Sequence, residues 1–131
     1  MQGDLLLSVT RLYVAILGIL FIVFTVRAGM YRVKTQISLG TGDDPEMLRR
    51  MRSQANFIET VPIALFVLIT VELLGMPALW LHALCSLLVF ARVSHYLALN
   101  QLGPFFLRPV GMVSTFLPIL IGSIWIFLKV L

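Results

Sequence analysis

Four long apolar stretches dominate this chain and leave few folds open to it. They cover residues 5–26, the later part of 45–74, 77–99 and 110–131. A helix needs about 20 apolar residues to cross a hydrocarbon layer about 30 Å thick, and each stretch is long enough. Hydrophobic residues make up 60% of the chain, charged residues only 12%, and the mean hydropathy is +1.00, which excludes an ordinary soluble domain. The sequence therefore predicts an all-α membrane protein, a four-transmembrane-helix bundle in which residues 1–131 form a single domain.

The breaks between the apolar stretches indicate how the helices connect. Residues 27–44 are basic and then rich in glycine and aspartate, so we expect a loop that ends in a helix start signal. Asp43 or Asp44 can cap the second helix, since a proline follows at its first position. A tight turn at 75–77 makes the third helix return antiparallel to the second. The segment 100–109 contains several helix breakers and forms the last loop.

The distribution of lysine and arginine predicts how the chain is oriented in the membrane. Most of these residues flank the loops after the first and third helices: Arg27, Arg32, Lys34, Arg49, Arg50, Arg52, Arg92 and Arg108. The opposite side carries only Arg11 and Lys129. By the positive-inside rule, both loops face the cytoplasm and both termini lie on the other side. A net charge of +4, clustered near helix ends, is typical of a topology signal and not of a nucleic-acid-binding surface.

Arg11 interrupts the first apolar stretch close to its start, and two interpretations are open. The side chain can snorkel toward the nearer interface. Alternatively, it can form an ion pair with Glu72, which the predicted topology places at the same side of the membrane.

The start of the second helix carries a stripe of polar side chains. At about 100° per residue, Arg49, Arg52, Asn56 and Glu59 fall on one narrow face of a helix. This stripe descends from the water interface into the hydrocarbon. A carboxylate is costly there unless something pairs with it, so Glu59 is a candidate functional residue.

Further polar residues are expected at the same end of the bundle. The third helix contributes Arg92 and His95, which are three residues apart and so share a face. Arg108 precedes the fourth helix, and Arg27 and Arg32 follow the first. Guanidinium groups bind carboxylates bidentately, an amide can bind a peptide group, and a carboxylate can hold an ammonium. Glutathione carries that set of groups and a thiol. The two distant histidines have no acidic companions, so no metal site is expected.

The second-helix motif resembles the signature of a known family. The pattern Arg52-x-x-x-Asn56-x-x-Glu59, followed by Pro62 and an apolar run, is similar to that of the MAPEG superfamily (membrane-associated proteins in eicosanoid and glutathione metabolism). The number of spans and the chain length agree with this resemblance. The residues of the motif are most similar to those of the bacterial branch. The resemblance therefore implies a bacterial inner-membrane protein like the microsomal glutathione S-transferases.

The resemblance also implies an assembly and a set of site residues. It implies a homotrimer with three glutathione sites between neighbouring subunits. The implied glutathione ligands and their near neighbours are Arg52, Asn56, Glu59, Arg49, Arg92 and His95, with Arg27 and Arg32 beside the first-helix position. Arg108 matches the fourth-helix arginine that stabilises the glutathione thiolate, and His95 is a secondary donor. Leu99 and Thr60 depart from the family pattern: both synthases of the family have a glutathione-binding tyrosine at the Leu99 position, and the leukotriene-forming synthase has another tyrosine at the Thr60 position.

The candidate site residues and the family resemblance lead to three candidate functions. The first is a membrane-bound glutathione-dependent transferase or peroxidase, whose lipophilic substrate enters from the membrane lipid. The second is a non-catalytic lipid-binding or scaffold protein of the same fold, an alternative that the missing tyrosines keep open. The third is a small multidrug transporter, but that class needs an acid in its first span, where this chain has Arg11.

Overall fold

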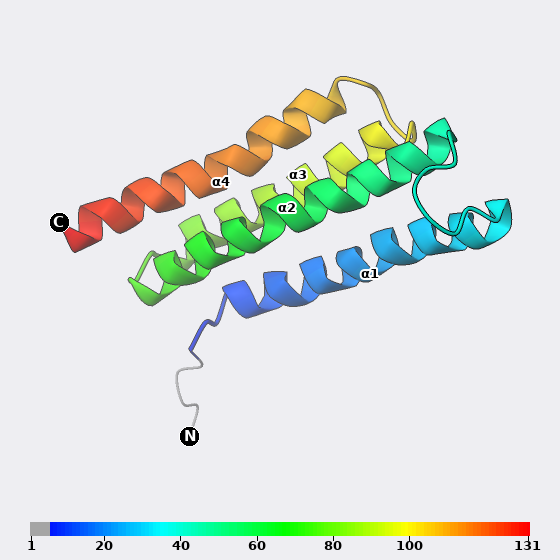
Figure 1. Ribbon diagram of the computed structural model, residues 1–131. Helices are drawn as coiled ribbons and strands as arrows, with labels where there is room; N and C mark the ends of the chain where they lie inside the picture. Colours follow the sequence, from blue (N-terminus) through cyan, green and yellow to red (C-terminus); the bar gives the residue numbers. More distant parts are fainter. Residues whose placement is uncertain (1–5) are drawn as a thin grey trace.

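The computed structural model describes residues 6–131, which form four long helices. They are α1 (Thr10–Thr35), α2 (Pro45–Leu73), α3 (Ala78–Leu99) and α4 (Leu107–Val130). Successive helices run antiparallel, so the α1–α2 and α3–α4 loops lie together at what we call the two-loop end (Figure 1). The C-terminus and the start of α1 lie at the opposite end. The predicted all-α four-helix bundle is confirmed.

Each of the four helices is long enough and apolar enough to cross a membrane. At about 1.5 Å per residue they measure about 33 to 44 Å, which exceeds the thickness of the hydrocarbon layer. Large apolar side chains also cover the outside of the bundle, among them Ile19, Phe66, Leu79, Phe90 and Phe127. A surface of this kind is not stable in water and, on helices long enough to span a bilayer, it indicates contact with lipid. The chain is an integral membrane protein.

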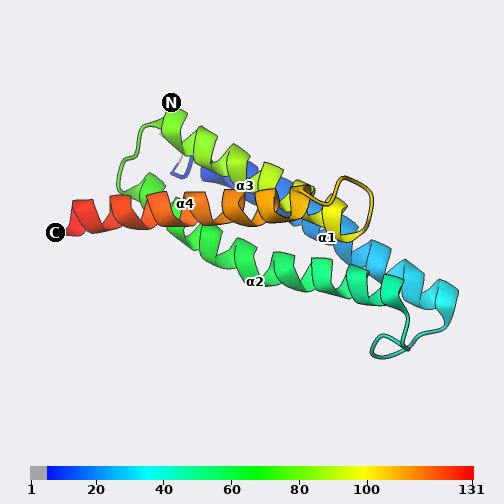
Figure 2. The same cartoon turned by 90° about the horizontal axis from the view of Figure 1, so that it is seen from above.

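The α2 and α3 helices each contact all the others, with α4 on one side of this pair and α1 on the other (Figure 2). Leu17 of α1, Leu68 of α2 and Leu88 of α3 are fully buried between the helices. The most extensive interface joins α3 to α4. At Gly111 this interface is so close that an added Cβ would lie 2.8 Å from the Ala91 carbonyl oxygen. Within residues 6–131, α1 packs on α2 and α3 but not on α4.

The first helix is longer than the sequence predicted. The loop expected at 27–44 is wrong in its first part, because α1 continues to Thr35. Its basic residues are good helix formers, so nothing in them ends the helix. The helix ends at Gln36, which adopts a left-handed conformation with φ of 58°. Arg32 then holds the loop, since its guanidinium donates to the Gly40 carbonyl oxygen at 2.9 Å.

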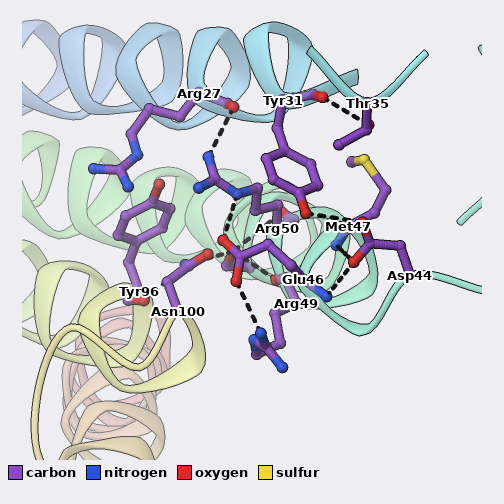
Figure 3. Close-up of polar contacts among 11 residues, drawn as sticks. Arg27, Tyr31, Thr35, Asp44, Glu46, Met47, Arg49, Arg50, Tyr96 and Asn100 are labelled. Carbon is purple, nitrogen blue, oxygen red and sulfur yellow. Dashed lines mark hydrogen bonds and ion pairs between the residues drawn. The ribbon is translucent and has the colours of Figure 1, made fainter. Parts of the chain in front are cut away.

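The start of α2 agrees with one of the two predicted caps. Asp44 Oδ1 accepts hydrogen bonds from the backbone N–H groups of Glu46 at 2.8 Å and Met47 at 3.3 Å. Its other oxygen accepts from the Tyr31 hydroxyl at 2.8 Å, which ties the end of α1 to the start of α2 (Figure 3). The Tyr31 hydrogen bond, and after it the two backbone bonds, lower the pKa of Asp44. The carboxylate is therefore ionised at neutral pH and complements the positive end of the helix.

A second acid connects α2 to the start of α1 at the opposite end of the bundle. Glu72, near the end of α2, accepts hydrogen bonds from the backbone N–H groups of Val9 at 2.7 Å and Thr10 at 2.8 Å. These are among the first N–H groups of α1, which have no partner inside the helix. Arg11 is exposed, and within the described residues it forms no ion pair with Glu72. Glu72 lies at the same end of the bundle as Arg11, as the ion-pair interpretation required, but its carboxylate accepts hydrogen bonds from the backbone at the start of α1.

Candidate functional site

A pocket of about 340 Å³ lies at the two-loop end, between α2, α3 and α4. It brings together five of the residues that the sequence singled out: Arg49, Arg52, Asn56, His95 and Arg108. Leu48, Leu99 and Met112 complete its lining. The α4 helix begins at Leu107, so Arg108 lies in its first turn and not in the preceding loop as expected.

The pocket has three guanidinium groups and no acid among its lining residues. Arg52 and Arg108 are exposed, and within residues 6–131 neither makes a side-chain hydrogen bond or an ion pair. Arg49 donates to Glu46 Oε2 at 2.8 Å, outside the pocket lining. Two of the three guanidiniums are therefore free to bind an anion. A partly enclosed site strengthens their attraction for a carboxylate or a thiolate compared with open water.

Arg92 does not line the pocket, although the sequence placed it among the ligands. Its side chain is 2% exposed and lies between α2, α3 and α4. It donates to Asn56 Oδ1 at 2.6 Å and to Thr60 Oγ1 at 2.8 Å. On α4 it donates to the Gly111 carbonyl oxygen at 3.3 Å and to the Thr115 hydroxyl. In this structure the Arg92 guanidinium is therefore hydrogen-bonded to oxygens of the protein and does not line the pocket.

Glu59 also lies outside the pocket. It occupies the midpoint of α2 on a side that is exposed in the single chain. Within the described residues its carboxylate has no ion-pair partner. The stripe predicted from helical periodicity is therefore divided, because Asn56 faces α3 and α4 while Glu59 faces outward.

Arg27 and Arg32 belong to a separate network around the α1–α2 connection. The Arg27 guanidinium lies over the Tyr96 ring, 5.8 Å from its centroid. Arg50 donates to the Arg27 carbonyl oxygen at 3.0 Å and pairs with Glu46 at 2.8 Å (Figure 3). Arg32 donates a hydrogen bond to the Gly40 carbonyl oxygen in the α1–α2 loop. Neither Arg27 nor Arg32 lines the pocket.

Sequence reasoning missed several residues that shape the site. Glu46 pairs with both Arg49 and Arg50, and among the described residues Arg52 is the arginine of that run without an ion pair. Gly111 and Thr115 supply oxygens to Arg92 from α4. Their spacing of four residues, one turn after Arg108, was the available signal, since it places a small residue and a hydroxyl on one face.

The fold and the pocket define a class of protein. It is a four-span integral membrane protein with an arginine-lined pocket at one end of its bundle. A family model described as the MAPEG family matches residues 10–128, and the chain belongs to that family. Most of its members are glutathione-dependent membrane enzymes. Searches of curated proteins and of solved structures each found no match.

Proposed function

We propose that this protein is a membrane-bound glutathione-dependent transferase or peroxidase that acts on lipophilic electrophiles or lipid hydroperoxides. The observation that carries this proposal is the pocket lined by Arg49, Arg52, Asn56 and Arg108 without an acid. Such a lining suits a ligand with several carboxylates and a developing thiolate. The proposal includes the bacterial branch of the family and its microsomal glutathione S-transferase-like members.

The proposed roles follow from the chemistry of each side chain. Arg49 and Arg52 bind the carboxylates of glutathione, and Asn56 binds a peptide group. Arg108 faces the thiol. A free cysteine thiol has a pKa near 8.5, and lowering it by about two units requires about 2.7 kcal/mol of differential stabilisation. One guanidinium in a partly dry site supplies stabilisation of that order. His95, which is buried beside the pocket, is a secondary donor.

Both proposed reactions, conjugation and peroxide reduction, balance in atoms and electrons with glutathione as the thiol. In conjugation, the thiolate sulfur forms a bond to the electrophilic carbon, and the leaving group departs with the bonding electrons. In peroxide reduction, two glutathione molecules are oxidised to their disulfide while the hydroperoxide is reduced to an alcohol and water. An apolar groove of about 310 Å³ between α1 and α2, lined in part by Phe21, Phe57 and Leu65, supports the entry of a lipophilic substrate from the bilayer.

The exposed Glu59 supports the proposal of a homotrimer with sites at the subunit interfaces. A carboxylate that faces lipid at the midpoint of a spanning helix is costly, and a neighbouring subunit would remove that cost. Glu59 would then hold the ammonium of glutathione across the interface. We expect the protein in mild detergent to have the mass of three chains by light scattering. A monomeric mass under conditions where glutathione still binds would contradict this assembly.

The proposed orientation places the two-loop end in the cytoplasm, with both termini on the opposite side of a bacterial inner membrane. The lysines and arginines that flank the two loops support this orientation. It also brings the pocket to the compartment where glutathione is kept reduced.

A direct test of the function is the ultraviolet difference spectrum on adding glutathione to the purified protein. We expect a thiolate band at neutral pH, because the pocket favours the ionised thiol. Conjugation of a generic aryl halide and reduction of a lipid hydroperoxide then identify the activity. Glutathione binding without a thiolate band or turnover would contradict the enzyme and favour the alternative, a non-catalytic lipid-binding or scaffold protein.

One observation favours that alternative. Thr60 and Leu99 occupy positions where the resemblance implied ligand-binding tyrosines. Thr60 instead accepts a hydrogen bond from Arg92, and Leu99 contributes an apolar wall to the pocket. A non-catalytic protein would retain the fold and bind lipid without ionising a thiol.

A further inference from the structure

The side chain of Asn56 connects the buried arginine to the pocket. Its oxygen accepts from Arg92 Nη1 at 2.6 Å, while its nitrogen lies 3.8 Å from Met112 Sδ, a weak acceptor on the pocket wall. An asparagine amide has one end that accepts and one that donates. Here the accepting end is used inside the protein, and the donating end lies beside the pocket.

The chemistry of Arg92 fixes this orientation. A guanidinium has five N–H donors and no acceptor, so only the oxygen of Asn56 can face it. Turning the amide over would place two donors against each other in a buried region, which leaves both unsatisfied. Arg92 in turn is held by Thr60, Gly111 and Thr115, so it cannot follow a rotated amide.

We infer that Arg92 is a positioning residue that acts through Asn56 and does not touch the ligand. It orients the Asn56 amide so that only its NH₂ group faces the pocket. The three guanidiniums that line the pocket with it, those of Arg49, Arg52 and Arg108, are donors as well. The ligand group bound at Asn56 is therefore an acceptor, either a peptide carbonyl or a carboxylate. This inference rests on the proposed function in taking glutathione as the ligand.

The variant Asn56→Asp separates the two ends of the amide. A carboxylate still accepts from Arg92, so we expect the unfolding temperature to be unchanged or raised. The pocket loses its donor and gains a negative charge, so glutathione affinity should fall by about ten- to a hundredfold. Full affinity in a stable Asn56→Asp protein would overturn the inference.

Asn100→Asp is the matched control, because it changes the only other asparagine in the chain. The Asn100 amide donates to Ser53 Oγ and to the Tyr96 carbonyl oxygen, both at 2.9 Å, and lies outside the pocket lining. Its replacement should lower the unfolding temperature and leave glutathione affinity unchanged, the reverse of the pattern expected at Asn56.

A double-mutant cycle tests whether Arg92 acts through Asn56. Lysine at position 92 keeps the charge but cannot span all four acceptors, so Arg92→Lys should weaken glutathione binding about tenfold. In a protein that already carries Asn56→Ala, the same change should have little further effect. Additive losses would show that Arg92 acts elsewhere, and would overturn the inference.

A measurement without ligand distinguishes this inference from the proposed function. In protein labelled with ¹⁵N-asparagine, only two side-chain amide groups give signals. We expect the Asn56 NH₂ protons, which face the pocket, to exchange with water faster than those of Asn100. Slow exchange at Asn56 would overturn the inference whether or not glutathione binds. A wild-type protein that fails to bind glutathione but shows fast exchange refutes the proposed function alone.

Discussion

Turnover should fall by about 10²- to 10³-fold when Arg108 is replaced with alanine, while glutathione affinity changes little. The guanidinium is exposed in the pocket and has no ion-pair partner within residues 6–131. Its positive charge stabilises the thiolate, which is the reactive form of bound glutathione, whereas the carboxylate contacts proposed for Arg49 and Arg52 supply most of the affinity. Removing it therefore costs about 3 to 4 kcal/mol in the transition state. Steady-state kinetics with a generic aryl halide give the turnover, and equilibrium dialysis gives the affinity.

The control for this experiment is Arg11→Ala, which removes an exposed arginine from α1 at the opposite end of the bundle. Its turnover should match that of the wild type. The loss of the thiolate band in Arg108→Ala would support the assigned role independently of turnover. If Arg108→Ala retains both turnover and thiolate, another group ionises the thiol.

Gly111→Ala should destabilise the protein by about 3 kcal/mol or more, at the upper end of the range for overpacking. An added Cβ would lie 2.8 Å from the Ala91 carbonyl oxygen and 2.9 Å from the His95 backbone nitrogen. These are backbone atoms of α3, so no side-chain rotation relieves the contact. The two helices must separate at the most extensive interface of the bundle. Thermal unfolding in detergent measures the loss.

Gly29→Ala is the matched control, since it is also a glycine within a helix but has nothing within 4 Å of the added Cβ. Alanine has the higher helix propensity by up to about 1 kcal/mol, so this variant should be as stable as the wild type or slightly more stable. An unchanged unfolding temperature in Gly111→Ala would mean that α3 and α4 are less closely packed than the structure indicates.

Much of the fold could be predicted from the sequence because the membrane imposes simple requirements. The lengths of the apolar stretches predicted the four helices, and the Asp44–Pro45 pair predicted the start of α2. The end of α1 could not be predicted, because Arg27, Arg32 and Lys34 are good helix formers whose charge says nothing about where the helix stops. Only the left-handed Gln36 and the loop bonds made by Arg32 determine that boundary.

The candidate site was predicted less completely, for a different reason. Helical periodicity groups Asn56 and Glu59, but it does not show which part of their shared face turns toward α3. Arg92 was assigned to the ligand because an arginine usually pairs with an anion. In this bundle it is surrounded instead by neutral oxygens of Asn56, Thr60 and Thr115, which lie on two other helices. Contacts of that kind depend on the packing of three helices, which one sequence does not encode in any local pattern.

The carboxylate of Glu72 has a consequence for biogenesis. Val9 and Thr10 are buried, and the polar hydrogens at this end of the first helix find their acceptor more than sixty positions later in the chain. During synthesis, the first segment is therefore made before the side chain that accepts these hydrogen bonds in the folded protein. Their protein acceptor arrives with the second segment, which carries Glu72 near its end. The two segments thus reach their final contacts as a hairpin, and a ribosome-bound chain that stops short of Glu72 lacks the carboxylate that caps its first helix.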